Sequence, residues 1–593
     1  MNESQKGSRE QGIERSFFRA SAKDFRKIPG GSIAYWLSSA MLNIFDSHDS
    51  LSAHCEIREG INTGDNERFL RRWQEVSFCK FRFPDKQTGT LNPKWFAHRK
   101  GGEFRKWFGN RDYVVNWEDE GADIHRFHDL PLDYNGAPVR GKAYFFKQGL
   151  SWSRISSGNF ALRFYDEGMT YDSTAPSIFA NEDDSLSILG LLNSRVVFKL
   201  LEALSPTLDF RLTSLGRLPF IASSLLRKKY GENLPAGKLI EISRRDWDSY
   251  EVSWDFTSLP LLHPEHRQPI LRASYQTLRA HWREMTQEMQ RLEEENNRIF
   301  IDAYGLQDEL TPEVPLNEIT LTCNPHYRYG GDKSEEELEA LLLADTMREL
   351  VSYAVGCMLG RYSLDKPGLI LANQSETLVD YLAQVPQPRF PADDDNVIPL
   401  LDGDWFPDDI TLRFRQFLRV AFGDAHYEDN LAFIEQALNV KGKRNYGLRD
   451  YLLGEFYADH VKRYKKRPIY WQFSSPRGSF NALIYMHRYR PDTVSVVLRY
   501  LRDYREKLAT EKERQAAISI SPASSQGDKT RALKETDRLA KVLAELEDYE
   551  RDVLYPLATQ QKQIDLDEGV KVNYLKFGAA LKKIPGLAAK DED

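Results

Sequence analysis

A short stretch near the middle of the chain, Asn324-Pro325-His326-Tyr327, combines an amide side chain, a proline and an aromatic ring. An amide and a neighbouring backbone carbonyl can accept hydrogen bonds from an exocyclic amino group, and an aromatic ring can stack on a base that has left the duplex. Proline fixes φ near about −65° and holds such a carbonyl in place. The stretch is therefore a candidate for chemistry on a nucleobase.

The tetrapeptide differs at one position from Asn-Pro-Pro-Tyr, the catalytic sequence of enzymes that methylate amino groups on DNA bases. His326 replaces the second proline and loosens the backbone. The only candidate for a Gly-rich S-adenosylmethionine turn, "AVGCMLGRY", has the wrong glycine spacing and lies in a helical pattern. We expect a turn before a helix that is capped by Ser334 and Glu337. A methyltransferase with a degenerate catalytic box at Asn324–Tyr327 is the alternative.

Two stretches interleave cations with aromatic and small polar residues, "HRKGGEFRKWFGNRDYVVNW" and "FFKQGLSWSRISSGNFALRF". Arginine, lysine and amide side chains on loops suit contacts to DNA phosphates and base edges, and a solvated strand edge is the simpler interpretation. Neither a P-loop nor a Gly-x-Ser-x-Gly motif occurs. The predicted DNA contacts in these stretches are Lys100, Arg105, Lys106, Lys147, Arg154 and Arg163.

A third basic region, residues 441–510, carries 16 Lys+Arg against 6 Asp+Glu. Its core is "HVKRYKKRPIYWQFSSPRGSFNALIYMHRYR", in which the aromatic residues could stack on bases or pack a core. Phosphate contact is plausible here, and a solvated helical face is the alternative. The predicted contacts are Lys462, Arg463, Lys465 and Lys466.

The composition limits the class of protein. The chain has 593 residues, and its 81 Lys+Arg stand against 88 Asp+Glu, so any basic surface must be local. The four cysteines have no zinc-ligand spacing, which predicts no metal site and no disulfide framework. The polar N-terminus lacks an apolar signal core, and no apolar run is long enough for a membrane span. We expect a cytoplasmic protein without membrane contact.

The pattern of elements predicts an α+β fold. Short apolar runs such as "DYVVNW", "KAYFFKQG" and "FALRFY" indicate strands in a mixed domain over residues 51–256, after an N-terminal linker and helix in residues 1–50. Residues 1–20 and the tail "GLAAKDED" look loose. The remaining segments are a long spacer helix (262–310), a helical C-terminal domain (311–490), a helical hairpin (491–560) and a tail (561–593).

The spacer helix has the sharpest periodicity in the chain. Apolar residues and one amide, Asn296, follow an unbroken 4,3 spacing from Leu271 to Ile299, which is typical of a coiled-coil seam. Asn296 occupies an a position, where a buried amide fixes the register. We expect the helix to pack against another long helix, and the hairpin 491–560 is the predicted partner.

Several strings resemble the C-terminal half of PglX, the adenine-specific DNA methyltransferase family of BREX phage-defence systems. They are "IPGGSIAYWLS", "REGINTGDNERFLR", "GGEFRKWFGNRDYVVNWEDEG", "ILGLLNSRVVFKLLEALSPTLDF", "WDSYEVSWDF", "NPHYRYGG" and "KVNYLKFGAALKKIPGL". The resemblance covers about residues 21–588. It extends more loosely to the recognition halves of Type IIG restriction-modification enzymes. In the family, the catalytic motifs precede the "IPGGSIAYW" stretch, which implies that the catalytic half lies outside this chain.

The resemblance implies that residues 51–256 are a target recognition domain that contacts duplex DNA, opened by "GINTGDNERF" with Asn62 as a candidate contact. No catalytic, cofactor or metal residue is predicted, and S-adenosylmethionine belongs to the missing catalytic domain. The implied partners are duplex DNA, a methyltransferase domain or subunit and other BREX proteins. The alternative to DNA recognition is a scaffold within the BREX complex that does not bind DNA.

Overall fold

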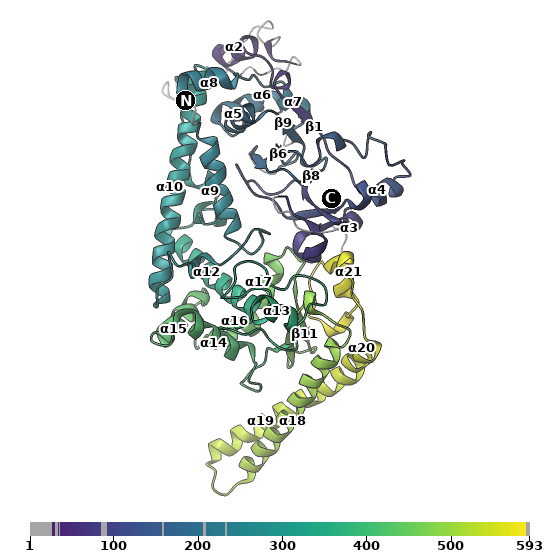
Figure 1. Ribbon diagram of the computed structural model, residues 1–593. Helices are drawn as coiled ribbons and strands as arrows, with labels where there is room; N and C mark the ends of the chain where they lie inside the picture. Colours follow the sequence, from purple (N-terminus) through teal and green to yellow (C-terminus); the bar gives the residue numbers. More distant parts are fainter. Residues whose placement is uncertain are drawn as a thin grey trace, which may run out of the picture.

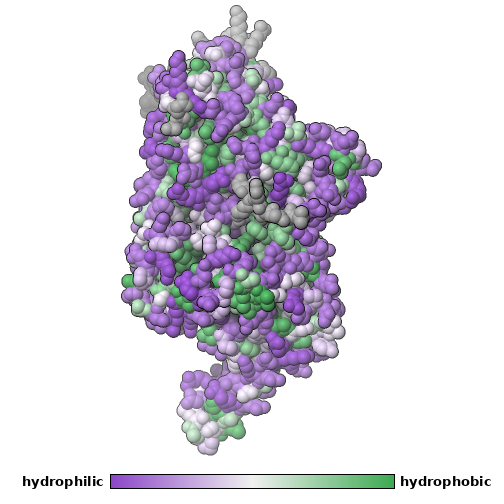
Figure 2. Space-filling model, viewed as in Figure 1, coloured by the Kyte–Doolittle hydropathy of each residue, from purple (hydrophilic) through white to green (hydrophobic). Residues whose placement is uncertain are grey.

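The computed structural model describes residues 27–29, 34, 36–84, 92–156, 159–205, 209–231 and 234–588. The predicted loose segment 1–20 and the last five residues of the tail lie outside them. The molecule is elongated, with the domain over residues 51–256 at one end, helix α10 along one side, a helical body at the other end and a projecting hairpin (Figure 1). The predicted α+β fold class is confirmed. The face seen in Figure 2 is mostly hydrophilic, with small hydrophobic patches.

Two sheets lie in the domain over residues 51–256. The first is antiparallel in the order β1-β9-β6-β7, and the second has the order β2-β5-β4-β3 with β8 paired to β4. Strands β3 and β8 both run parallel to β4. The strands are β1 (Glu56–Arg58), β9 (Ser177–Phe179), β6 (Gly149–Trp152), β7 (Leu162–Tyr165), β2 (Leu70–Arg72), β5 (Tyr113–Asn116), β4 (Trp95–Arg99), β3 (Phe81–Arg82) and β8 (Thr170–Tyr171).

The predicted strands are confirmed in "DYVVNW" and "FALRFY", which hold β5 and β7. The strand predicted in "KAYFFKQG" is wrong, because Lys142–Tyr144 form a 3-10 turn and β6 begins later, at Gly149. Helices surround the sheets, and the predicted N-terminal helix begins at Ser39. They are α2 (Ser39–Ser47), α3 (Asn66–Phe69), α4 (Ala122–Phe127), α5 (Glu182–Leu192), α6 (Arg195–Leu204), α7 (Leu212–Gly216), α8 (Ser223–Tyr230) and α9 (Ala236–Asp248).

Helix α10 (Leu271–Ala303) is the long helix that the heptad pattern predicts, and most of its seam is buried. Its packing partners are the shorter helices α5, α6 and α9, together with α15 of the helical body. The hairpin instead packs on itself and on α20, so the predicted pairing with α10 is wrong. The helix therefore joins the two ends of the molecule, as Figure 1 shows.

A buried amide fixes α5 on α10. The Asn296 side chain is 2% exposed and donates from Nδ2 to the Gly190 carbonyl at 2.8 Å. A Cβ at Gly190 would lie 2.7 Å from Asn296 Oδ1 and 3.1 Å from the Phe300 ring, so only glycine allows this approach. Asn296 thus fixes the position of a short helix on α10, not the register of a coiled coil.

The helical body also contains a small sheet that the sequence pattern did not predict. Strand β12 lies between β10 and β11, and all pairs are antiparallel. The capping box at Ser334 and Glu337 is confirmed. The elements are α11 (Pro325–Tyr329), α12 (Glu335–Met358), α13 (Leu378–Gln384), β10 (Ile398–Pro399), α14 (Ile410–Phe422), α15 (Tyr427–Leu438), α16 (Leu448–Gly454), α17 (Phe456–Arg463), β11 (Tyr470–Ser474) and β12 (Asn481–Tyr485).

The predicted hairpin is confirmed as α18 (Thr493–Ile520) and α19 (Gln526–Tyr549), and a π-helical turn, Glu550–Leu554, leads into α20 (Tyr555–Gln560). The end of the chain then returns to the domain over residues 51–256 through α21 (Gly569–Leu575), which lies near α3 in Figure 1.

Asp567 anchors this return. Its carboxylate accepts hydrogen bonds from Trp95 Nε1 at 2.9 Å, Lys80 Nζ at 2.7 Å and Lys94 Nζ at 3.1 Å. Burial alone would raise the pKa of Asp567, but the bonds from Lys80 and Trp95 and the charge of Lys94 hold it below its ordinary value. The tail predicted over 561–593 is thus attached to both β3 and β4 through one carboxylate.

The hydrophobic core is continuous across the predicted domain boundaries. One cluster of buried residues joins α2, the four-stranded sheet, α10, the helical body and the tail, and two smaller clusters lie beside the five-stranded sheet. Among the described residues, no helix is both long and apolar enough to cross a membrane.

We predict that Gly190→Ala lowers the free energy of unfolding by about 1–3 kcal/mol, because the new methyl group overpacks the α5–α10 contact. The control is Gly237→Ala in α9, where a Cβ meets nothing within 4 Å. That change should raise stability by about 0.4–1 kcal/mol through the unfolded chain. Urea unfolding followed by circular dichroism measures both, and effects of the same sign would contradict the packing argument.

Candidate nucleic-acid interface

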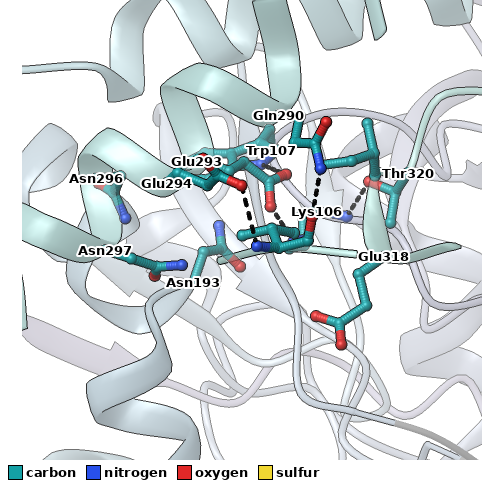
Figure 3. Close-up of polar contacts among 12 residues, drawn as sticks. Lys106, Trp107, Asn193, Gln290, Glu293, Glu294, Asn296, Asn297, Glu318 and Thr320 are labelled. Atoms are coloured by element: carbon teal, nitrogen blue, oxygen red, sulfur yellow. Dashed lines mark hydrogen bonds and ion pairs between the residues drawn. The ribbon is translucent and has the colours of Figure 1, made fainter. Parts of the chain in front are cut away.

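Three of the predicted DNA contacts lie inside the protein. Lys106 Nζ pairs with the Glu293 carboxylate of α10, and the same carboxylate accepts from Trp107 Nε1 at 2.7 Å (Figure 3). Arg105 is 3% exposed and pairs with Asp246 at 2.7 Å. Arg163 is 1% exposed.

These surroundings explain why basic residues sit in a core. Arg163 donates to the Arg105 carbonyl at 3.1 Å, and Arg105 also donates to the Phe108 carbonyl at 2.9 Å. A buried charge is tolerated only when it is paired and hydrogen-bonded. The prediction that Arg105, Lys106 and Arg163 contact DNA is corrected, because internal partners occupy these side chains and no surface is left for a phosphate.

The predicted contacts of the third basic region, residues 441–510, also include a residue that is paired inside the protein and others that are exposed. Arg463 turns inward to Glu251 at 3.3 Å, with 19% of its side chain exposed, so it is not free for DNA. The aromatic residues of the "RPIYWQF" stretch pack in the core as β11. Lys462, Lys465 and Lys466 remain exposed, and the latter two adopt positive φ angles in a tight turn.

The first and third basic stretches meet in space. Lys465 Nζ bonds Glu103 Oε1 at 2.7 Å, which places the turn after α17 beside the loop after β4. Lys100, at the start of that loop, lies 3.5 Å from Asp172 and is 20% exposed. Lys100 and Lys465 are more than 350 residues apart in the chain, yet both lie at the loop after β4.

A group of accessible arginines lies around Glu59, just after β1. Glu59 bonds Arg140 at 2.9 Å and Arg154 at 3.3 Å, and the exposed fractions of these two side chains are 42% and 34%. Arg58, 46% exposed, lies over the Tyr144 ring at 5.2 Å. We call this set, Arg58, Glu59, Arg140, Tyr144, Lys147 and Arg154, the arginine cluster.

The cluster depends on a close approach of two loops. Gly141 has a φ of +81°, and a Cβ there would lie 2.8 Å from the Glu59 carbonyl. Lys147 is exposed, and its ammonium lies over the Tyr144 ring, 5.0 Å from the ring centroid. Lys147 and Arg154 are therefore predicted residues that the structure brings together. Arg58 and Arg140 were missed, because each is an isolated cation in the sequence.

Asn62 is exposed and lies three residues after Glu59 in the chain. Its Oδ1 accepts from the Gly64 backbone at 3.0 Å, which closes the turn expected in "GINTGDNERF". Its own backbone amide donates to the Pro138 carbonyl at 2.9 Å, so it lies beside the loop that carries Arg140. Among the described residues, the side-chain amide nitrogen of Asn62 has no hydrogen-bond partner.

An apolar side chain stands next to the arginine cluster. Ile155 is 75% exposed, and its neighbour Arg154 bonds Asp209 at 2.9 Å. A backbone bridge between Ile155 and Asp209 fixes the start of this loop. A single exposed isoleucine is common on protein surfaces, so its place beside Arg154, not its exposure, makes it a candidate for contact with a ligand of the arginine cluster.

The tetrapeptide at Asn324 is a helix start. Asn324 is 1% exposed, and its Oδ1 accepts from the His326 backbone at 3.2 Å. Its Nδ2 donates to the carbonyls of Leu316 at 2.7 Å and Ile319 at 2.9 Å. Both amide hydrogens are used, and the Tyr327 hydroxyl donates to the Phe104 carbonyl. The predicted turn before the capped helix is confirmed, and these side chains are engaged in the fold rather than aimed at a base.

Two curated proteins match the chain along nearly its whole length. The "Adenine-specific methyltransferase BrxX" of Escherichia coli O9:H4 (strain HS) is 36% identical over 582 residues, which are 95% of this chain and 46% of that protein. The "Adenine-specific methyltransferase PglX" of Lacticaseibacillus casei (strain Zhang) is 36% identical over 590 residues, 96% of this chain and 46% of that protein. The chain is related to adenine-specific methyltransferases. It spans about half the length of these relatives, and no protein-family model matches it.

We predict that Glu293→Ala lowers the free energy of unfolding by about 3–5 kcal/mol, because it leaves the Lys106 ammonium buried without a counter-charge. Glu288→Ala is the matched control on the same helix. Glu288 pairs with Arg291 on the surface and is 45% exposed, so its loss should cost about 0–1 kcal/mol.

The measurement is urea unfolding followed by tryptophan fluorescence, since Trp107 shares the Glu293 carboxylate. If the two variants lose equal free energies of unfolding, the Lys106–Glu293 pair does not hold the domain over residues 51–256 on α10.

Proposed function

We propose that this chain supplies sequence-specific recognition of duplex DNA for a BREX-type adenine-N6 DNA methyltransferase, in host DNA modification and phage defence. The observation that carries the proposal is the match to two adenine-specific methyltransferases along 95–96% of the chain, at 46% of their length. In this proposal the methyl transfer and the S-adenosylmethionine site belong to a methyltransferase domain or subunit outside these residues. The other BREX proteins are further partners.

The arginine cluster is the proposed phosphate-binding element. Glu59 holds Arg140 and Arg154 in fixed orientations while leaving a third or more of each side chain exposed. A guanidinium oriented in this way loses less freedom when it forms a bidentate bond to a phosphate. Four cations of the cluster, Arg58, Arg140, Lys147 and Arg154, stand against the three carboxylates that pair with them, Glu56, Glu59 and Asp209, so a small positive excess remains although the chain as a whole is acidic.

Asn62, Lys100 and the turn with Lys462, Lys465 and Lys466 extend the proposed interface. The bond from Lys465 to Glu103 places this turn beside the loop that begins at Lys100. An exposed amide such as Asn62 suits an adenine edge, whereas lysines suit phosphates. The arginine cluster would then anchor one part of the duplex and the lysine turn another.

The charge contribution is tested by fluorescence anisotropy with a labelled duplex at several salt concentrations. We expect the triple variant Arg58→Ala, Arg140→Ala, Arg154→Ala to bind more weakly and to lower the salt slope by up to about 3. The control is Arg283→Ala, Arg291→Ala, Arg298→Ala, which removes three exposed arginines of α10. The chain alone should transfer no methyl group to DNA.

An equal loss in both triple variants would mean that binding is not local to the cluster. An absence of duplex binding at low salt would favour the scaffold alternative. Transfer of labelled methyl groups from S-adenosylmethionine by the purified chain would contradict the division between recognition and catalysis.

Ile155 gives a prediction of a different kind. An apolar side chain beside phosphate-binding arginines can contact a thymine methyl group or wedge between base steps. We expect Ile155→Ala to reduce binding to the preferred duplex by about 1–3 kcal/mol and to leave the salt slope unchanged, because no charge is removed. Selection of the preferred sequence from a random pool precedes this measurement. A variant that binds preferred and random duplexes exactly as the parent does would exclude Ile155 from recognition.

A further inference from the structure

A cavity of about 860 Å³ lies at the base of the hairpin, far from the arginine cluster. Three segments enclose it: the turn between β11 and β12, the facing parts of α18 and α19, and the end of the chain from Tyr574 to Ala588. Sites for small molecules usually occupy about 300–1,000 Å³, so the cavity has a suitable size. It plays no part in the proposed DNA interface.

The cations around this cavity outnumber the carboxylates. Arg477, Lys582 and Lys583 line it, together with Arg538, which is paired with Glu535 at 2.6 Å. Asp402 is the only carboxylate among the described lining residues. This arrangement favours a ligand that carries more than one negative charge.

Lys582 is one of the cations that line the cavity. Its backbone is fixed on both sides, since its amide donates to the Gln472 carbonyl at 2.8 Å and its carbonyl accepts from the Tyr574 hydroxyl. Its ammonium lies over the Tyr457 ring at 5.7 Å, and no carboxylate of the described residues pairs with it. Burial lowers the pKa of Lys582. An anion in the cavity would supply the missing counter-charge.

The turn that carries Arg477 is held at the cavity by a partly buried carboxylate, Glu545. The Glu545 carboxylate of α19 accepts from the Arg477 backbone amide at 2.7 Å and from the hydroxyls of Ser475 at 2.6 Å and Ser479 at 2.5 Å. The turn is therefore rigid while the Arg477 side chain stays exposed. A rigid turn with a free guanidinium is suited to binding a phosphate.

Two aromatic side chains, Trp405 and Tyr504, also line the cavity. Trp405 lies edge-on to Tyr504 with ring centroids 5.5 Å apart, and its Nε1 donates to the Asp402 carbonyl at 2.9 Å. Trp405 is only partly buried, so its ring is accessible from the cavity. Aromatic rings that are held in place can stack on a nucleobase, and every base offers a flat face.

We propose that this cavity binds a nucleoside polyphosphate, with its phosphates at Lys582, Arg477 and Lys583 and its base against Trp405. Cations without a carboxylate partner among the described residues and an accessible aromatic ring line the same cavity, and they match the two ends of such a ligand. The site is separate from duplex binding and stands whether or not the chain recognises DNA.

The test is isothermal titration calorimetry of the whole chain with ATP as the probe, at low salt. ATP should bind at one site, and adenosine and tripolyphosphate should each bind at least about tenfold more weakly, because each lacks one half of the contacts. Equal binding of ATP and tripolyphosphate would overturn the assignment of a nucleotide. An absence of heat with millimolar ATP would overturn the site.

Variants locate the site. Lys582→Ala with Arg477→Ala should weaken ATP binding about tenfold, and Asp402→Asn should tighten it several-fold, because it removes the one lining carboxylate. Among the described residues the Asp402 side chain has no hydrogen-bond or ion-pair partner, so Asp402→Asn should leave the fold intact. Lys534→Ala, an exposed lysine on α19 outside the cavity, is the control and should change nothing.

The duplex-binding measurement separates this proposal from the previous one. The cavity variants should leave duplex affinity unchanged, and the arginine-cluster variants should leave ATP affinity unchanged. If Asp402→Asn fails to tighten binding and the double variant fails to weaken it, ATP binds elsewhere and the proposal is wrong.

Discussion

The buried carboxylate of Glu293 is the constraint on which the rest of the structure depends. It stands on α10 and accepts from Lys106 and Trp107, which follow the loop after β4. A desolvated carboxylate is tolerated only with such partners, so this pairing fixes the loop after β4, and with it the domain over residues 51–256, on α10. The pair of Arg105 with Asp246 of α9 adds a second fixed point close by.

This docking decides which cations remain for a ligand. The segment from Arg105 to Arg111 looks like the strongest DNA-binding stretch in the sequence, yet its charges are consumed in holding two parts of the protein together. The accessible arginines gather instead at Glu59, near the end of β1. A rigid support beneath them means that little ordering is left to occur on binding, which is the condition for specific contacts.

The sequence was informative where the pattern is local. The heptad spacing of α10, the capping box at Ser334 and the helical hairpin follow from residues close together in the chain, and the structure confirms them. The partners of charged residues cannot be predicted in this way, since Lys106 and Glu293 are 187 positions apart. For the same reason Arg58 and Arg140, which lie far apart in the sequence, gave no signal, although Glu59 and Tyr144 bring them together.

The strand pair β11–β12 shows the limit of composition as evidence. Its flanks are rich in cations, and its aromatic residues could equally have stacked on bases. In the structure these residues fill the core, and the turn between the strands carries one exposed arginine to the cavity. The end of the chain lines the same cavity after Asp567 has joined it to β3 and β4. One segment therefore touches the domain over residues 51–256, the helical body and the hairpin, and its two anchoring points, Asp567 and Lys582, are only 15 residues apart. Because it is held at both ends, this short segment connects the base of the hairpin to the domain over residues 51–256.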